Sequence, residues 1–435
     1  MKLKTILKIT NGKIINNASD KVKIRKIQID SRKVKKNDLF IAIIGENKDG
    51  HDYINDAIKL GANAIICEKD LNIETNIPII KVTSTVKTLG SLALANRVKN
   101  KSIPLIAITG SCGKTTTKEL ISLILSKKYN VLKNEGSLNN HLGLPMTLLD
   151  LNDRYDVAVL EMGMNHENEI SYLSNIALPN YGIITNIGSS HIGNLGSKKN
   201  ILKAKMEITN GISNGTLIVN GEDKYLKKVK YKNIIKVKND AYDLNYEFNK
   251  TTFKLNIDNK EYSFNFNVPG KHLIMDILIA IKVGILFNVE IKDIISSIYE
   301  YRSINGRLNI IEKEELTIID DAYNSSFESL IGSLSLLNKE THNIVILGDI
   351  LELGNKSYKI HKKINKKLKK FPIEHLLLIG EYTKVINGIH FEDLDSLLSY
   401  LYKILEPNSV VLIKGSSKMN LKYIVDDLVI KKSRN

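Results

Sequence analysis

Short apolar runs separated by stretches of helical spacing recur along the chain and predict its secondary structure. Near the N-terminus, residues 38–43 and 64–67 form apolar runs typical of buried strands. Between them, residues 53–61 have the spacing of a helix that ends at a glycine. Strands that alternate with helices in this way indicate βαβ units and a mainly parallel sheet.

The same alternation continues through two further blocks of the chain. The second block contains apolar runs at 103–109, 157–160 and 182–185, and the third contains runs at 316–319, 343–347, 376–379 and 410–413. Between residues 216 and 268 the pattern changes to a period of two on either side of a turn, which predicts an antiparallel hairpin. A basic stretch at 361–370 has helical spacing and is interpreted as a solvated helix face.

We therefore predict an α/β protein of three domains, at residues 1–101, 102–305 and 306–435. A chain of 435 residues is long enough for about three domains of typical size. The central domain is expected to carry a mainly parallel sheet with a small antiparallel addition. The C-terminal domain is expected to be a Rossmann-like α/β unit. Hinges are expected near residues 101 and 306.

Composition adds to this picture mainly by excluding classes of protein. Two cysteines cannot form a disulfide framework, which favours a reducing, cytoplasmic location. Residues 1–8 lack the apolar stretch of a secretory signal, and no apolar run approaches the roughly 18 residues needed for membrane insertion. The formal net charge of +16 comes largely from lysines scattered along the chain, so we expect no nucleic-acid partner.

A glycine-containing loop between a predicted strand and a predicted helix carries the strongest chemical signal. Its residues, all candidates for nucleotide binding, are Gly110, Ser111, Cys112, Gly113, Lys114, Thr115 and Thr116. The two glycines allow backbone N–H groups to surround phosphate oxygens, Lys114 can reach the β- and γ-phosphates, and Thr115 can ligate Mg²⁺. The first glycine of the generic phosphate loop is replaced by Ile108. Cys112 is interpreted as a small residue that fills the loop.

Two further predicted strands end in residues that suit a metal or catalytic site. Glu161 follows the apolar run at 157–160, and His191 lies a few residues beyond the run at 182–185. Because the carboxyl ends of parallel strands meet at one edge of a sheet, we expect these side chains to converge on the phosphate loop. A carboxylate at this position is well placed to hold Mg²⁺.

These motifs resemble those of the ATP-dependent Mur ligase family, and the resemblance extends over nearly the whole chain. It includes residues 30–32, 49–52, 139–147, 161–166, 185–188 and 203–208, in addition to the phosphate loop. In the C-terminal block it includes residues 320–324, 347–354 and 414–416. The C-terminal motifs are similar to those of the branch that adds D-alanyl-D-alanine, and the Asp-Asn-Pro-Arg motif of the diaminopimelate-adding branch is absent.

The resemblance implies a reaction and a function for each domain. ATP would activate the terminal carboxylate of UDP-MurNAc-tripeptide as an acyl phosphate, and the amine of D-Ala-D-Ala would then displace phosphate. The product would be the UDP-MurNAc-pentapeptide used in peptidoglycan synthesis. The first domain would bind the UDP-sugar, the central domain ATP and Mg²⁺, and the third would close on the nucleotide and the second substrate. We expect small-molecule substrates and a monomer.

The resemblance also implies which residues form the site. It implies two Mg²⁺ ions and a carbamylated Lys205, which would act as a carboxylate-like ligand beside His191. The implied metal ligands are Thr115, Glu161, His191 and Lys205, and the implied catalytic residues are Lys114, Glu161, His191 and Lys205. The implied nucleotide contacts outside the loop are Asp276, Arg307, Asp321, Tyr323 and Asn324, and the implied substrate contacts are Ser31, Arg32, Asn139, Asn140 and Asn165.

The chain departs from the family pattern at two places. Leu273 and Asp276 stand where family members commonly carry two asparagines near the adenine, and a carboxylate cannot donate a hydrogen bond as an amide does. Ser326 and Phe327 replace an Asn-Pro pair, which removes the fixed φ of proline.

Several alternatives remain open at this level. One is another amide-forming ligase of the same architecture, such as a tripeptide-forming Mur ligase or a folate polyglutamylating enzyme. Others are a nucleic-acid-dependent ATPase and a phosphate-loop regulatory protein without turnover. The third residue of the tripeptide, meso-diaminopimelate or L-lysine, also stays open.

Overall fold

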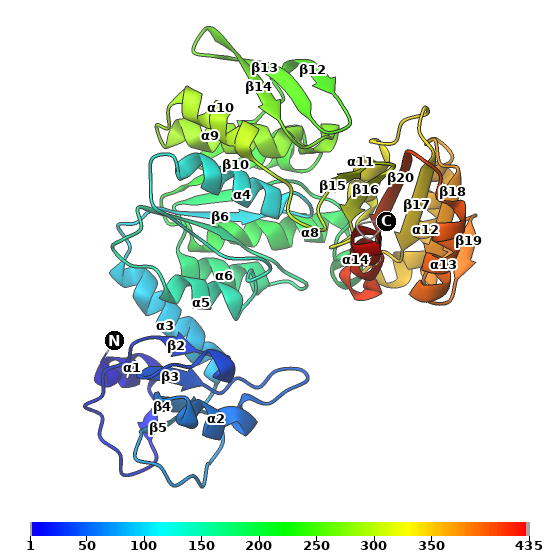
Figure 1. Cartoon of the computed structure of the whole chain (residues 1–435). Coiled ribbons are helices and arrows are strands. Elements are labelled where there is room, and N and C mark those ends of the chain that lie inside the picture. Colours follow the sequence, from blue (N-terminus) through cyan, green and yellow to red (C-terminus); the bar gives the residue numbers. More distant parts are fainter. Residues whose placement is uncertain (1, 432–435) are drawn as a thin grey trace.

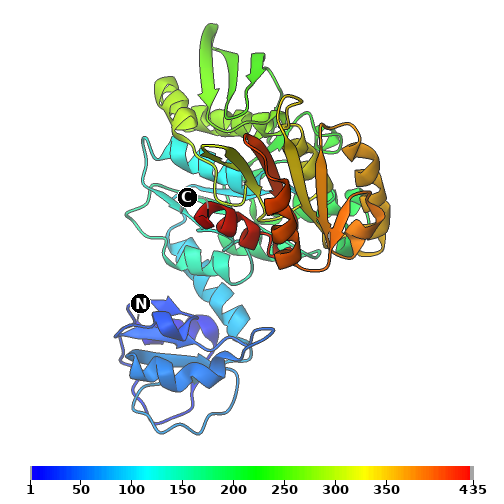
Figure 2. The same ribbon diagram turned by 45° about the vertical axis from the view of Figure 1, so that its right-hand side comes forward.

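The computed structural model describes residues 2–431, which form three domains (Figure 1). The N-terminal domain lies at one end of the molecule, and the C-terminal domain packs against the side of the central domain in both views (Figures 1 and 2). Each domain is built around its own mainly parallel sheet, as the alternation of strands and helices predicts. Met1 and residues 432–435, which the expected domain boundaries include, lie outside the described residues.

The N-terminal domain has a five-stranded sheet with the order β1-β5-β4-β3-β2. Its strands are β1 (Lys13–Ile14), β2 (Ile27–Gln28), β3 (Asp38–Ile41), β4 (Ala62–Cys67) and β5 (Ile79–Lys81), and its helices are α1 (Leu3–Thr10), α2 (Ile54–Lys59) and α3 (Thr85–Lys99). The predicted strands at 38–43 and 64–67 and the helix between them are confirmed. Helix α3 leads to the central domain, where the buried Arg97 guanidinium donates hydrogen bonds to the carbonyls of Ile103 and Ala177.

The central sheet is entirely parallel and has the order β11-β10-β9-β6-β8-β7. Its strands are β6 (Leu105–Thr109), β7 (Val131–Lys133), β8 (Val157–Glu161), β9 (Tyr181–Ile184), β10 (Thr216–Asn220) and β11 (Ile234–Val237). Since β6 pairs with β9 on one side and β8 on the other, the carboxyl ends of these three strands lie side by side. The phosphate loop, which follows β6, therefore lies beside the carboxyl ends of β8 and β9, as predicted.

Helices cover both faces of the central sheet (Figure 1). The helices are α4 (Lys114–Leu125), α5 (Gly143–Leu149), α6 (Glu169–Ala177), α7 (Ile192–Leu195), α8 (Lys198–Met206), α9 (Ile274–Leu286) and α10 (Ile291–Glu300). Helices α4, α9 and α10 pack together on one face, and α5, α6 and α8 lie on the other. Helix α9 buries apolar residues on nearly all sides, and these join the main hydrophobic core of the protein.

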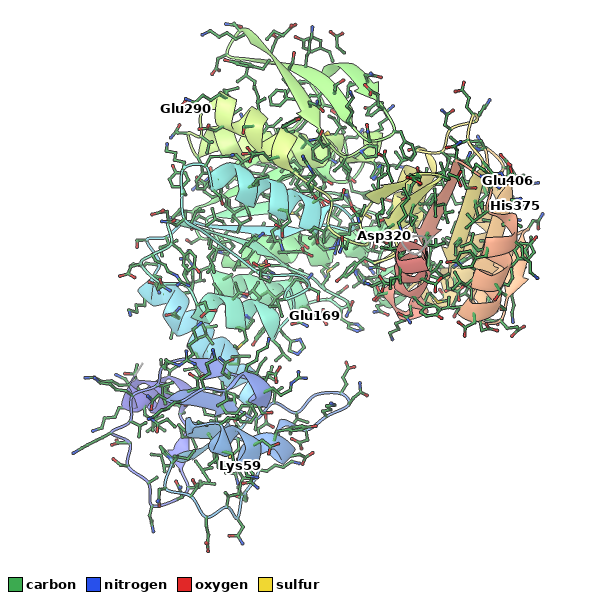
Figure 3. All side chains as sticks on the ribbon, in the orientation of Figure 1. Lys59, Glu169, Glu290, Asp320, His375 and Glu406 are labelled. Carbon is green, nitrogen blue, oxygen red and sulfur yellow. The ribbon has the colours of Figure 1, made fainter. Side chains whose placement is uncertain are left out.

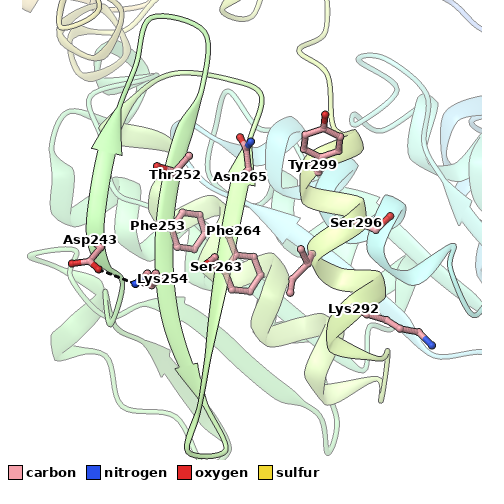
Figure 4. Close-up of a pocket in the computed structure, with 11 residues that line it drawn as sticks. Asp243, Thr252, Phe253, Lys254, Ser263, Phe264, Asn265, Lys292, Ser296 and Tyr299 are labelled. Atoms are coloured by element: carbon pink, nitrogen blue, oxygen red, sulfur yellow. Dashed lines mark ion pairs between the residues drawn. The ribbon is translucent and has the colours of Figure 1, made fainter.

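The predicted antiparallel hairpin is confirmed, and a third strand extends it. Strands β12 (Tyr242–Tyr246), β13 (Thr251–Ile257) and β14 (Lys260–Phe266) form a separate sheet. The stacked rings of Phe253 and Phe264, 5.0 Å apart, lie at a groove between this sheet and α10 (Figure 4). No predicted site residue lines this groove.

The C-terminal domain has a six-stranded sheet with the order β15-β16-β20-β17-β18-β19, in which only the edge strand β15 is antiparallel to its neighbour. Its strands are β15 (Asn309–Lys313), β16 (Leu316–Asp321), β17 (Asn343–Gly348), β18 (His375–Ile379), β19 (Ile389–Phe391) and β20 (Ser409–Lys414). Its helices are α11 (Phe327–Leu334), α12 (Ser357–Leu368), α13 (Leu394–Ile404) and α14 (Lys422–Lys431). The four predicted strands and the basic helix are confirmed. Within residues 2–431, every helix is too short or too polar to cross a lipid bilayer.

Candidate active site

The phosphate loop connects β6 to α4 and is held in shape by the end of β9. The amide of Asn186 clamps the Cys112 residue, because its Oδ1 accepts from the Cys112 N–H and its Nδ2 donates to the Cys112 carbonyl, each at 3.0 Å. The Thr185 hydroxyl donates to the same carbonyl, and the Ser111 N–H donates to the Asn186 carbonyl at 3.1 Å. Sequence reasoning assigned no function to Asn186, although its place directly after a strand beside the loop was a usable signal.

The two glycines of the loop are required by close contacts. A Cβ atom on Gly110 would lie 1.8 Å from the Thr185 hydroxyl oxygen. Gly113 has a φ of 78°, and a Cβ atom there would lie 2.3 Å from Oδ2 of Asp276. The loop therefore cannot accept a side chain at either position without displacing a neighbour.

Two hydroxyl groups, one at the end of β6 and one in the phosphate loop, have no partner within the described residues and suit a bound phosphate. The hydroxyls of Thr109 and Ser111 are buried and make no hydrogen bond in residues 2–431. The Lys114 ammonium donates to the Gly110 carbonyl at 3.0 Å, which keeps it folded over the loop. Buried donors without partners are costly, and a phosphate group at the N-terminus of α4 would satisfy them.

Glu161, at the end of β8, presents a buried carboxylate beside the loop. Its side chain accepts hydrogen bonds from the Thr115 hydroxyl and the Asn139 amide, each at 2.7 Å. The residue is only 1% exposed, and no lysine, arginine or histidine in the described part of the chain forms an ion pair with it. A buried carboxylate next to a hydroxyl and without a cation is a fitting ligand for a divalent metal ion.

Lys205, near the end of α8, is buried close to the phosphate loop. Burial, together with the nearby Lys114 ammonium, lowers the pKa of the Lys205 ammonium well below its ordinary value. Within residues 2–431 its side chain forms no ion pair and no hydrogen bond. A neutral amine in this setting is the form that can react with CO₂, which fits the expected carbamate.

His191 lies at the entrance to α7 and contacts the C-terminal domain. Its backbone is in the left-handed region, with a φ of 60°, and its Nδ1 lies 2.6 Å from Oε2 of Glu352. The described residues contain no group of three or more His, Cys, Asp and Glu side chains that could hold a metal ion. The four expected metal ligands include one glutamate, Glu161, and one histidine, His191. The other two expected ligands are Thr115 and Lys205, which are not among those residue types.

The expected substrate-binding residues occupy different settings. The Arg32 guanidinium pairs with the Asp30 carboxylate at 2.9 Å, and the arginine side chain is 86% exposed; Ser31 is in the same short 3₁₀ turn, Ser31–Lys33. The Oδ1 of Asn140 accepts from the backbone N–H groups of residues 142 and 143 where α5 begins. Asn165 is exposed, and its N–H donates to Glu169 at 2.6 Å.

The expected nucleotide contacts of the third domain lie at the end of β16 and in the segment that precedes β15. The Arg307 guanidinium sits 4.3 Å from the centre of the Tyr323 ring, and Asp321 forms a buried ion pair with Lys414. Lys414 also donates to the Asn324 carbonyl at 3.1 Å, so it fixes this turn. Figure 3 labels the neighbouring Asp320 on the side of the domain that faces the central domain.

Asp276 lies at the start of α9, behind Gly113 of the phosphate loop. Burial raises the pKa of its carboxyl group to about 7. Its place against the loop backbone is observed, whereas its expected contact with adenine stays a prediction.

We predict that Asp276→Asn stabilises the protein above neutral pH. Because the folded-state pKa exceeds the unfolded value, the native carboxyl keeps its proton between pH 4 and about 7, and stability falls as the pH rises through this window. Each pKa unit corresponds to about 1.4 kcal/mol, so removing the ionisable group should raise Tm by several degrees at pH 8 and by much less at pH 5. Thermal unfolding at both pH values tests this, and an equal change in Tm at the two would contradict it.

Together, the fold and this site define a three-domain phosphate-loop enzyme of the ATP-using class. Three family profiles match the chain: "Mur ligase family, catalytic domain" at residues 23–113, "Mur ligase middle domain" at 108–284 and "Mur ligase, glutamate ligase domain" at 306–417. The chain belongs to the Mur ligase family, whose members are ATP-dependent ligases.

Individual relatives match over nearly their whole length. The chain is 31% identical to a Bacillus subtilis protein named UDP-N-acetylmuramoyl-tripeptide--D-alanyl-D-alanine ligase, with 98% of each chain covered. It is 34% identical to a protein of the same name from Buchnera aphidicola, with 94% of this chain and 93% of the other covered. A crystal structure of MurF from Acinetobacter baumannii superposes with a TM-score of 0.91 at 29% identity, and 98% of each chain is covered.

A second solved structure bears on the nucleotide. MurF ligase from Thermotoga maritima in complex with ADP matches with a TM-score of 0.84 and 26% identity, covering 92% of this chain and 96% of that one. A nucleotide complex in a structural relative of this similarity supports ATP as the nucleotide of this ligase.

Proposed function

We propose that the protein is an ATP-dependent ligase that joins D-alanyl-D-alanine to UDP-MurNAc-tripeptide and so forms the UDP-MurNAc-pentapeptide for peptidoglycan synthesis. The observation that carries the proposal is the buried Glu161 carboxylate, which has no cationic partner in the described residues and lies beside the phosphate loop. The hydroxyls of Thr109 and Ser111 likewise make no hydrogen bond in that part of the chain. These groups occur in a chain that matches, over almost its full length, relatives named for this reaction. This proposal includes ATP as a substrate and amide-bond formation through an acyl phosphate.

The main physical obstacle to the first step is the repulsion between a carboxylate and a triphosphate. Lys114, folded over the phosphate loop, would place a positive charge beside the phosphates, and Arg307 of the third domain would add another. Thr109 and Ser111 would donate hydrogen bonds to phosphate oxygens. These groups hold the reactants in line and offset the charge that builds up in the transition state.

We propose that the site binds two Mg²⁺ ions. Thr115 and Glu161 would hold the first, because their oxygens are adjacent and the Asn139 amide fixes the carboxylate. His191 and a carbamylated Lys205 would hold the second. When bound, the ions neutralise phosphate charge and polarise the reacting groups.

We further propose that residues 1–101 bind the UDP-sugar, that residues 102–305 bind ATP and Mg²⁺, and that residues 306–435 close on the nucleotide and the second substrate. Ser31 and Arg32 are proposed to hold the UDP end. Asn139, Asn140 and Asn165 are proposed to contact substrate, and Asp276, Asp321, Tyr323 and Asn324 the nucleotide. We propose a monomer that acts on small-molecule substrates in the cytoplasm.

The substrate assignment predicts a specific product. With ATP, Mg²⁺ and UDP-MurNAc-tripeptide, the purified protein should add D-Ala-D-Ala at a rate at least about tenfold above that with meso-diaminopimelate, L-lysine or glutamate as the amine. The third domain binds the second substrate in this account, and discrimination among amines follows from its contacts. Mass spectrometry of the UDP-linked product measures it, with both forms of the tripeptide as donors. Preferential addition of glutamate or of a single diamino acid would instead support one of the related ligases.

A further inference from the structure

Helix α11 of the C-terminal domain points its first turn at the phosphate loop. Ser326 caps this helix, because its Oγ accepts from the Ser329 N–H at 3.1 Å, and the same Oγ lies 3.1 Å from the Sγ of Cys112. Phe327 occupies the first helical position, where the family pattern has proline, and its ring packs under the Lys363 ammonium at 4.1 Å. Helix α11 therefore begins at Phe327 without the proline of the family pattern, because Ser326 caps it. The Ser326 side chain also contacts Cys112 of the central domain.

Glu328, in the first turn of α11, makes a three-point contact with the central domain. Its Oε2 accepts from the Ser189 N–H at 3.1 Å and from the Ser189 hydroxyl at 2.6 Å. Its Oε1 accepts from the Lys198 ammonium at 2.9 Å. Burial acts to raise the pKa of Glu328, but the Ser189 and Lys198 contacts outweigh it and keep the pKa below its ordinary value.

Glu328 contacts the segment of residues 187–191, which leads from β9 to the expected metal ligand His191 and packs against the phosphate loop. Ser189 lies between β9 and His191, and a Cβ atom on the adjacent Gly188 would come within 3.0 Å of Ser111 and 3.3 Å of the Glu328 carboxylate. The Ser190 hydroxyl donates to the Ser111 carbonyl at 3.2 Å. Thus Glu328, the 187–191 segment and the phosphate loop form one packed contact.

A second contact between the same two domains lies farther along this segment. The Gly193 N–H donates to the Glu352 carbonyl at 3.0 Å, and Lys356 donates to the Gly196 carbonyl. That contact includes His191, an expected metal ligand, through Glu352. Glu328 touches no expected metal ligand, so its contribution to domain docking can be measured separately from metal binding.

We propose that Glu328 is a positioning residue that holds the C-terminal domain in register against the phosphate loop through Ser189 and Lys198. It does so by a charge-assisted contact made across the domain boundary, where Arg307, Tyr323 and Asn324 must be brought over the nucleotide. The catalytic consequence rests on the proposed function, whereas the docking itself does not. Small displacements of positioned groups cost large factors in rate, so loss of this contact should be visible in turnover.

The test compares Glu328→Gln with a matched variant of the full-length protein. Glu381→Gln is the control, since Glu381 also pairs with a lysine, Lys384 at 2.7 Å, but both partners belong to the C-terminal domain. Small-angle X-ray scattering with a non-hydrolysable ATP analogue and Mg²⁺ measures docking, and phosphate release measures kcat and KM. Thermal unfolding shows that each variant is folded.

We expect Glu328→Gln to increase the radius of gyration and to lower kcat/KM for ATP at least tenfold, with Glu328→Asp restoring part of the loss. Lys198→Met should have a similar effect, and the double variant should lose little more than either single one. Wild-type scattering and wild-type kcat/KM in Glu328→Gln would overturn the proposal. If the wild-type protein shows no turnover with D-Ala-D-Ala, the proposed function fails, and the scattering comparison still decides the role of Glu328.

Discussion

Glu161→Gln is expected to lower ATP-dependent turnover by about 10³-fold or more while the protein stays folded. The substitution keeps the size of the side chain but removes the negative charge that would hold Mg²⁺ beside Thr115. Loss of a group that stabilises charge in the transition state typically costs 10² to 10³-fold, and here the metal ion itself would be lost. Phosphate release at saturating substrates measures the effect, and titration with Mg²⁺ shows whether the remaining activity needs more metal.

A control carboxylate in the same domain separates this effect from general changes in charge. Glu290 precedes α10 and pairs with Lys292 at 2.7 Å, in an exposed setting (Figure 3). Glu290→Gln should retain turnover within a factor of about two, because substitutions of this kind at the surface are nearly neutral. If Glu161→Gln stayed within tenfold of the wild type, the proposed first metal site would be wrong.

Lys205→Met is expected to lower turnover by about 10² to 10³-fold and to remove a carbamate from the protein. The wild-type side chain is buried without an ion pair in the described structure, and its lowered pKa leaves the amine available to CO₂. Methionine fills a similar volume but cannot become a metal ligand of this kind. Carbon-13 NMR of protein equilibrated with labelled CO₂ detects the carbamate directly, independently of the activity assay.

Lys203 provides a close control, because it lies on the same helix and its side chain is 75% exposed. Lys203→Met should keep both the carbamate signal and normal turnover. Two results would contradict the account: a wild-type protein without a carbamate signal, or a Lys205→Met variant as active as Lys203→Met. The first would also remove Lys205 from the proposed second metal site.

Much of the fold could be predicted from the sequence because buried parallel strands have a clear local signature. Strands β6, β8 and β9 are short, mostly apolar runs that end at the same edge of the sheet. Strands β6 and β8 end in the polar residues Thr109 and Glu161, and β9 ends at Ile184, directly before Thr185. The rule that parallel strands bring their carboxyl ends together then placed Glu161 beside the phosphate loop. The period-two pattern likewise identified β13 and β14.

Contacts between distant segments could not be predicted in this way. The clamp of Asn186 on Cys112 joins residues 74 positions apart, and the place of Asn186 after a strand does not specify which atoms it contacts. The pairing of His191 with Glu352 depends on how two domains pack, which hydrophobic periodicity does not encode. Sequence motifs indicated that these segments matter, but only the folded arrangement shows which atoms meet.

Asp276 illustrates the same limit at a single position. The sequence resemblance placed it near the adenine, because asparagine commonly occupies that position in the family. In the structure its carboxylate packs behind Gly113, and burial there raises its pKa to about 7. The motif thus predicts a role for Asp276, but the burial that sets its pKa is seen only in the folded structure.

The most direct test of the central proposal is the substrate dependence of phosphate release by the purified wild-type protein. With ATP and Mg²⁺ present, phosphate should be released at a catalytic rate only when UDP-MurNAc-tripeptide and D-Ala-D-Ala are supplied together, with one pentapeptide formed for each phosphate. Catalytic phosphate release that requires UDP-MurNAc-tripeptide but continues undiminished without D-Ala-D-Ala would contradict the assignment.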